Sequence, residues 1–492
     1  MRKTFEPQLT LGCTPIEEVV IPIKTKSHLP ALAAALKYIY INPEWNQRIF
    51  ALLSSKMRDG KKDTGRKGMS LWEIFVLAQV RLCQNISYDE LHFISNDSEL
   101  VRGIMGVLPT DFSAGKQYKY QNIYDNVTLL DDELLKEIND VIVEVGHQVF
   151  KKKGKTAEGE VALQCKTDSF VVETDTHFPT DYNLLWDSAR KCIDTADYLC
   201  NEGSLRGWRK SKEWRKSLKG LMRMVGKTSN GGGKNKAERL QKATTTYLTK
   251  ARTLEKKVTI SLKNYRPLTN KELLATLSLE YYHKMLTLHI DLLERRLIKK
   301  ETIPHQEKTF SIFQPYTEFI KKGKLHPNVE IGKKLAITSD QYHLIIDWQI
   351  AENQTDNQLT LPIANRLAQK YDIESLSLDR GFSDMEDKKL LESFIPQVIM
   401  PKKGKLSTEE KTLESAPAFK RLKNKHSAVE SNINELEHRG LDRCPNRTRK
   451  TFDSYIGLAI TAYNLHKIGR ELQGQMLEKQ KAKKQKSYRQ AA

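Results

Sequence analysis

Three acidic residues occupy positions from which carboxylates could act together at phosphorus. Asp168 lies in an apolar segment with the pattern of a strand, Asp379 ends a second such segment, and Glu430 lies on a later helix. Carboxylates that meet at one point repel each other unless a divalent cation neutralises them, and oxygen-only ligands suit Mg²⁺, with Mn²⁺ as a substitute. Two ions roughly 4 Å apart can activate a water or a 3′-hydroxyl and stabilise the leaving oxygen of an in-line displacement. These residues therefore predict metal-dependent chemistry on phosphodiesters.

Other acids compete for each of the three positions. The competitors are Asp175 and Asp181 for Asp168, Asp384 for Asp379, and Glu435 and Glu437 for Glu430. Asp175 lies past the expected strand, and Asp181 and Asp384 stand where a helix cap is expected. Glu437 shares a helix face with Glu430, so it stays open as a neighbour of the site.

The elements that must position these acids alternate between strand and helix. The strands are expected at 161–173, 333–338, 342–350, 373–378 and 396–400, and the helices at 359–370, 383–394, 417–440 and 451–468. Three successive strands, a helical crossover and two further strands are the element order of the ribonuclease H-like fold. In that fold the first strand lies beside the fourth, so Asp168 and Asp379 would face each other, and a late helix would add Glu430.

A long helical segment, expected at 187–303, separates the first strand from the second. Its stretch from Arg206 to Lys227 holds nine Lys or Arg residues and one acid. Positive charges at this density repel each other without an anion nearby, which favours contact with a DNA backbone over a purely solvated helix. Trp208 and Trp214 could stack on an unpaired base, although anchoring in a helical core is the interpretation that we favour.

The N-terminal segment has the pattern of short helices with tight links. Ser70 with Glu73, and Ser87 with Glu90, have the spacing of capping boxes, and a third short helix is expected at 100–105. Three such helices fit a DNA-binding helix-turn-helix unit, and they fit a plain bundle used for packing or dimerisation equally well.

The composition favours an anionic partner and argues against several classes of protein. The 492 residues include 81 Lys and Arg against 61 Asp and Glu, a formal net charge of +20 that attracts nucleic acid. The sequence has no long apolar run, no secretory pattern, and no CxxC, HExxH or P-loop motif. A membrane span, secretion and a zinc site are therefore not expected. The basic stretch 470–492 lacks an apolar period, and we expect it to be disordered.

Five blocks of the sequence resemble the DDE transposases of bacterial insertion sequences. They are SLWEIFVLAQVRLCQNISYDELH (70–92), TDSFVVETDTHFPTDYNLLWD (167–187), HPNVEIGKKLAITSD (326–340), SLDRGFSD (377–384), and HSAVESNINELEHRGLDRCPNR (426–447) with YNLHKIG (463–469). The blocks stand in the order of the family and extend over most of residues 65–470. They look closest to the loosely classified elements that have a large helical insertion after the first strand.

The resemblance implies a DNA transposase that binds terminal inverted repeats, cleaves DNA strands and transfers them to a target with two Mg²⁺ ions. Asp168, Asp379 and Glu430 would be its catalytic residues and metal ligands. It also implies double-stranded DNA as the partner, a homodimer or larger assembly on DNA, and a cytoplasmic, nucleoid-associated bacterial protein. The residues expected to contact DNA are Arg209, Lys210, Arg215, Lys216, Lys402, Lys403, Lys405, His438 and Arg439. A catalytically silent repressor derived from a transposase and a structure-specific nuclease are the alternatives.

Together these patterns predict an α/β ribonuclease H-like catalytic core with a mixed five-stranded sheet and flanking helices. A large helical insertion would interrupt the core, and an all-α N-terminal domain would precede it. The expected segments are an N-terminal arm and helix (1–66), a helical DNA-binding domain (67–155), the catalytic domain (156–186 and 304–468), the basic helical insertion (187–303) and a basic tail (469–492).

Overall fold

The computed structural model describes residues 12–57, 68–108, 116–151, 162–321 and 328–491. Contacts divide the chain into two compact units, one formed by Met1–Asp175 with Gly332–Ala492 and the other by Thr176–Ile331. The predicted boundaries at 66–67 and 155–156 lie outside the described residues. None of the described helices is long and apolar enough to cross a membrane.

Helices precede the first strand in the larger unit. They are η1 (Ile16–Glu18), α1 (His28–Ile41), α2 (Pro43–Met57), α3 (Leu71–Gln84), α4 (Tyr88–Asp97), α5 (Glu99–Met105), α6 (Tyr120–Val127) and α7 (Asp132–Lys151). Ser87 and Glu90 form the predicted capping box of α4. Ser70 accepts the Glu73 N–H at the start of α3, but the Glu73 carboxylate binds the ammonium group of Lys116 at 2.6 Å. These helices belong to the same unit as the sheet, so a separate N-terminal domain stays a prediction.

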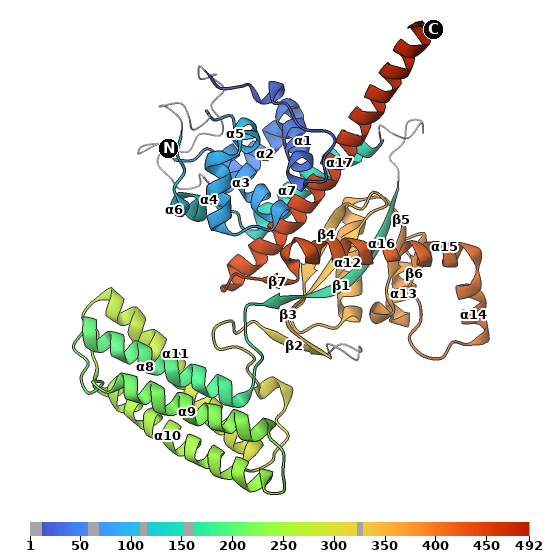
Figure 1. The fold of residues 1–492 in the computed structure, drawn as a ribbon. Helices are drawn as coiled ribbons and strands as arrows, with labels where there is room; N and C mark the ends of the chain where they lie inside the picture. The colour runs from blue at the N-terminus through green and yellow to red at the C-terminus, as the bar shows by residue number, and fades with distance from the viewer. Residues whose placement is uncertain (1–11, 58–67, 109–115, 152–161, 322–327, 492) are drawn as a thin grey trace. The chain divides into compact units, whose positions relative to one another are not determined.

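One long helix, α17 (Arg449–Ala491), packs against α1, α3 and α7 (Figure 1). Its buried side chains include Phe452, Ile460 and Leu465. A Cβ at Gly469 would collide with the backbone carbonyl of Ala31 in α1, so the close approach of the two helices requires glycine.

The predicted disorder of 470–492 is wrong for the described part, because α17 continues through Ala491. Arg470 donates to the carbonyls of Thr25 and Lys26, at 2.8 and 3.1 Å, and Gln473 donates to the carbonyl of Pro22 at 2.9 Å. Leu472 is buried. Tertiary contacts therefore hold the first turns of a stretch whose composition alone is typical of disorder.

The sheet has seven strands, five of them at the predicted places. These five are β1 (Leu163–Thr174), β3 (Val329–Ser339), β4 (Ile345–Ile350), β5 (Ile373–Leu378) and β6 (Gln397–Ile399). β1 lies between antiparallel β3 and parallel β5, while β4 pairs with β3 and β6 with β5. The expected pairing of the first strand with the fourth is confirmed, since β1 pairs with β5, and the mixed sheet is compatible with a ribonuclease H-like core. The number five is wrong because β2 (Glu318–Lys321) and β7 (Arg443–Cys444) are too short to show an alternating pattern.

Shorter helices follow the hairpin of β3 and β4. They are α12 (Asp356–Lys370), η3 (Arg380–Phe382), α13 (Met385–Leu391), α14 (Thr408–Ser415), α15 (Pro417–Lys425), α16 (Ser427–Leu436) and the π-helical turn η4 (Glu437–Leu441). The single helix predicted at 417–440 is therefore divided. Gly440 has a φ of +100° in η4, a conformation that ends the regular helix and favours glycine.

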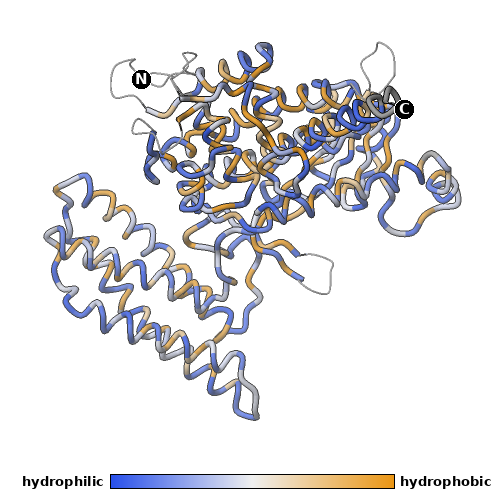
Figure 2. The backbone as a smooth tube through the Cα atoms, turned by 45° about the horizontal axis from the view of Figure 1, so that its top comes forward, coloured by the Kyte–Doolittle hydropathy of each residue, from blue (hydrophilic) through white to orange (hydrophobic). Residues whose placement is uncertain are grey.

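The smaller unit contains four long helices that lie side by side (Figure 1). They are α8 (Asp181–Glu202), α9 (Ser211–Asn230), α10 (Lys236–Asn264) and α11 (Asn270–Leu297), followed by η2 (His305–Glu307). Hydrophilic and hydrophobic positions alternate along them (Figure 2), and the hydrophobic ones form a common core that includes Leu218, Tyr247 and Leu286. Trp208 belongs to this core and donates to the Ser261 hydroxyl at 3.0 Å, which supports anchoring rather than base stacking.

Candidate active site

The parallel pairing of β1 and β5 brings Asp168 and Asp379 to the same level of the sheet. Thr167 and Leu378 form the last pair between β1 and β5. Asp168 directly follows Thr167, and Asp379 directly follows Leu378. Side chains at matching positions of neighbouring parallel strands lie beside each other, since the strands are about 4.8 Å apart. The crossover through α12 is what makes β5 the parallel neighbour of β1.

Glu430 comes from α16, which contacts β1. A cavity of about 420 Å³ lies beside it, and both Asp379 and Glu430 line this cavity. The helix is held in place by its buried face, where Asn432 accepts the Tyr463 hydroxyl of α17 at 3.0 Å. The structure thus brings Glu430 to the same edge of the sheet as Asp379.

The electrostatics of Asp168 reflect both burial and the neighbouring acids. Burial is the main cause that raises the pKa of Asp168 to about 7, and the charges of Asp379, Glu430 and Asp356 raise it further. A hydrogen bond from the Ser169 N–H, at 2.7 Å, acts in the opposite direction. Three other carboxyl groups therefore lie close enough to act on the charge of Asp168.

Asp356 is a member of this group that sequence reasoning did not assign to the site. Its Oδ1 accepts a hydrogen bond from the Ser169 hydroxyl at 2.8 Å and lies 3.0 Å from the Lys334 ammonium group. A Cβ at Gly381 would meet its Oδ2 at 2.9 Å, so Asp356 lies against the turn that follows Asp379. No local sequence signal could have shown this, because the contacts join α12, β1 and β3.

His426 is a second residue that sequence reasoning did not assign to the site. Its Nδ1 lies 3.1 Å from the Ser377 hydroxyl, and it lines the same cavity as Asp379 and Glu430. Burial lowers its pKa, whereas the charges of those two acids act to raise it. Its Nε2 is buried and has no hydrogen-bond partner among the described residues. This ring nitrogen is therefore available for a hydrogen bond beside the acids.

Most of the competing acids are engaged elsewhere. Asp175 pairs with Arg443 at 2.8 Å, Asp181 with Arg296 at 2.8 Å, and Glu435 with Arg439 and Lys467 at 2.7 Å each, while Asp384 caps α13. Glu437 lies in the turn η4. Asp168, Asp379 and Glu430, by contrast, have no ion-pair partner within the described ranges. This difference supports the choice of these three over their rivals.

Arg439, expected to contact DNA, is only 5% exposed. Its guanidinium donates to Glu435 at 2.7 Å and lies 2.8 Å from Nδ1 of His466. The group therefore joins η4 to α16 and α17 and is not open to a phosphate. No local pattern of the sequence indicates this burial, because Arg439 lies in the non-helical turn with Gly440. His438, next to it, is exposed.

The other residues expected to contact DNA differ in their exposure and in their carboxylate partners. Arg209, Lys210, Lys216, Lys403 and Lys405 are exposed. The Nε of Arg215 lies 2.7 Å from Asp194, and Lys402 lies 2.7 Å from Glu410, so these two cations already have close carboxylate partners. Lys210 lies 3.8 Å from Glu213, a longer contact between two exposed side chains.

The number and type of oxygen ligands that the three acids offer can be compared with those that a divalent cation requires. Within the part of the chain that the structure describes, no three His, Cys, Asp or Glu side chains converge closely enough to hold a metal ion. The chemistry of the donor set nevertheless fits Mg²⁺, because the three acids offer only carboxylate oxygens and lack a protein cation. A bound cation would also remove the repulsion that raises the pKa of Asp168.

Comparison with known proteins gives one match. The family model described as a transposase DDE domain matches residues 302–465, a stretch that contains Asp379 and Glu430. Asp168 and the four helices α8 to α11 lie outside the matched stretch. No curated protein and no solved structure among those compared matches the chain. The resemblance to DDE transposases is thereby confirmed.

Proposed function

Because the chain carries a transposase DDE domain, we propose that it is the DNA transposase of an insertion sequence. It binds the terminal inverted repeats, cuts DNA at the ends of the element and joins the freed 3′-hydroxyls to a target. The observation that carries this proposal is that Asp168 and Asp379 directly follow the paired residues Thr167 and Leu378. Two or more copies assembled on DNA in the bacterial cytoplasm, at the nucleoid, belong to the same proposal.

In this proposal Asp168, Asp379 and Glu430 hold two divalent ions, Mg²⁺ or Mn²⁺ in its place. When bound, such ions supply activation of a water or 3′-hydroxyl and stabilisation of the leaving oxygen. The protein's own part is positional: the paired strands β1 and β5 fix the two aspartates, and the Ser169 N–H orients Asp168. A fixed arrangement of this kind lowers the cost of reaching the transition state.

The exposed cations among the expected residues are proposed to hold the DNA backbone. They are Arg209, Lys210, Lys216, Lys403, Lys405 and His438. Arg215, Lys402 and Arg439 are left out, because each has a carboxylate partner at 2.7 Å. Contacts to phosphate carry little sequence information, so recognition of the repeats requires other groups, for which the helices α3 to α5 are the proposed source.

The decisive experiment replaces Asp379 with Asn and measures nicking of labelled element-end DNA with Mg²⁺ and with Mn²⁺. Asp379→Asn should abolish cleavage and leave DNA binding, measured by mobility shift, unchanged. Asp384→Asn is the matched control, because Asn caps a helix as well as Asp does and should retain cleavage.

Three results would contradict the proposal in different ways. Cleavage that survives Asp379→Asn would overturn the assignment of the site. A wild-type protein that binds element ends but never nicks them would be a repressor, and one that cuts without joining would be a nuclease.

A further inference from the structure

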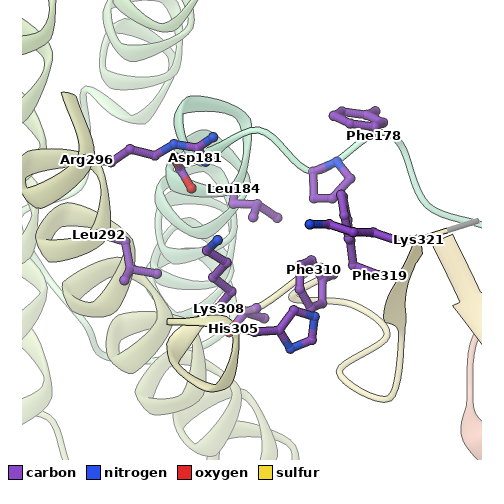
Figure 3. Close-up of a pocket in the computed structure, with 12 residues that line it drawn as sticks. Phe178, Asp181, Leu184, Leu292, Arg296, His305, Lys308, Phe310, Phe319 and Lys321 are labelled. Atoms are coloured by element: carbon purple, nitrogen blue, oxygen red, sulfur yellow. Dashed lines mark hydrogen bonds and ion pairs between the residues drawn. The ribbon is translucent and has the colours of Figure 1, made fainter. Parts of the chain in front are cut away.

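A second cavity, of about 290 Å³, lies within the smaller unit and combines aromatic with basic side chains (Figure 3). Its aromatic members are Phe178, Phe310 and Phe319, and its basic members include His305, Lys308 and Lys321. They come from the segment before α8, from η2 and the residues after it, and from β2.

Three of the rings pack together on one side of the cavity, while Phe178 lies apart from them (Figure 3). Phe310 and Phe319 stack with their ring centroids 5.4 Å apart, and the His305 ring lies 5.1 Å from Phe310. Phe178 stands at the rim and is 61% exposed. A phenyl ring with an open face can stack on another flat ring, which is worth more than burial alone.

The charges around the cavity are not balanced by acids. The lining contains one carboxylate, Asp181, and Arg296 binds it at 2.8 Å. Lys308 and Lys321 have no ion-pair partner among the described residues. The cavity therefore presents positive charge next to an aromatic surface.

We propose that this pocket binds one unpaired nucleotide of the DNA substrate, with its base against the phenylalanines and its phosphate beside the lysines. Stacking on aromatic rings and tracking of the backbone by cations are how proteins hold single-stranded DNA without reading its sequence. The volume of about 290 Å³ lies just below the roughly 300–1,000 Å³ of small-molecule pockets, which suits one base better than a base pair. The inference rests on the proposed function, since DNA is the source of the nucleotide.

The test uses the full-length protein, a fluorescent single-stranded 12-mer and the duplex of the same sequence, with binding measured by anisotropy. Phe178→Ala should weaken single-strand binding by roughly five- to 150-fold, the range for loss of one stacked base, and leave duplex binding unchanged. Because Phe178 is largely exposed, the substitution should not disturb folding. Phe394→Ala, at a 41% exposed site in the larger unit, is the matched control and should change neither affinity.

Two further binding measurements distinguish recognition of the base from recognition of the phosphate, and binding of a DNA strand from binding of a free nucleotide. With an abasic strand, wild type and Phe178→Ala should bind alike, whereas Lys308→Gln should bind more weakly than either. Single-strand affinities that are equal in wild type, Phe178→Ala and Lys308→Gln would overturn the pocket. If Phe178→Ala and Lys308→Gln lost binding to a free deoxynucleoside monophosphate but bound the single strand as well as the wild type does, the assignment of the pocket to DNA would be overturned. Failure of the wild type to bind or cut any DNA would instead refute the proposed function.

Discussion

Replacing Asp168 with Asn should stabilise the metal-free protein, although it should also abolish cleavage. The pKa of Asp168 is raised from 3.8 to about 7, so the folded state disfavours its ionised form. At about 1.36 kcal/mol per tenfold change in proton affinity, this rise costs on the order of 4 kcal/mol once the group is ionised in both states. A neutral amide of nearly the same shape avoids that cost.

The pH dependence follows from the sign of the shift. A carboxyl whose pKa is raised by folding contributes stability below pH 3.8, and this contribution is lost as the pH rises through about 7. The Asn variant should therefore exceed wild type in free energy of unfolding by about 2 kcal/mol at pH 5.5 and by about 4 kcal/mol at pH 8.

Denaturant unfolding in EDTA at the two pH values measures this difference. Asp175→Asn is the matched control: it removes a surface ion pair with Arg443, so it should cost at most about 1 kcal/mol at both pH values. Adding Mg²⁺ should stabilise the wild type and Asp175→Asn but not Asp168→Asn, because only the intact carboxylate set binds the ion. A difference between Asp168→Asn and wild type that is absent, or that does not grow between pH 5.5 and pH 8, would refute the reasoning that burial and neighbouring acids hold Asp168 protonated.

Two further predictions concern the basic side chains. Changing Arg209, Lys210 and Lys216 together to Gln should make DNA binding less sensitive to salt. The slope of log affinity against log salt concentration should fall by up to about three, roughly 0.9 per lost phosphate contact, for cognate and random DNA alike. An unchanged slope in a salt titration would show that these three residues do not contact the DNA. Arg439→Met should lower stability by roughly 1–3 kcal/mol, because it removes the buried guanidinium that bonds to Glu435, while Lys467 still pairs with that carboxylate. It should leave the DNA affinity of the folded protein unchanged. Weaker DNA binding with normal thermal unfolding would contradict that second expectation.

The parts of the fold that local patterns specify could be predicted. The capping box of Ser87 and Glu90 begins α4 because both partners lie within one turn. The strand that ends at Asp379 follows from its apolar run, and its place beside β1 is expected from the element order of the ribonuclease H-like fold. This neighbour relation could therefore be expected without knowledge of any contact.

The parts that could not be predicted depend on contacts between distant segments. Asp356 meets Ser169 across 187 residues of sequence, so its place near the acids has no local signal. The burial of Arg439 depends on a turn at Gly440 and on His466 of another helix. The composition of residues after 469 indicates disorder, yet Leu472 is buried and Gln473 donates to the carbonyl of Pro22 in the N-terminal segment. In each case tertiary packing overrides the local pattern.

The cluster of Asp168, Asp379 and Glu430 lowers the free energy of unfolding at neutral pH, and no structural role in the fold explains why these acids are present. The core of the larger unit is built from apolar side chains of the sheet and of α17, and none of the three acids contributes an ion pair to it among the described residues. Burying Asp168 among other carboxylates raises its pKa, which means that the ionised state works against folding at neutral pH. Such an arrangement persists only where the surrounding strands and helices hold it in place. A divalent cation would reverse the sign of the interaction, because the same charges that repel each other would then share a positive partner. The acids are therefore better explained as a site for ions than as part of the core, and this is the physical reason to expect that metal binding and catalysis are lost together when one of them is neutralised.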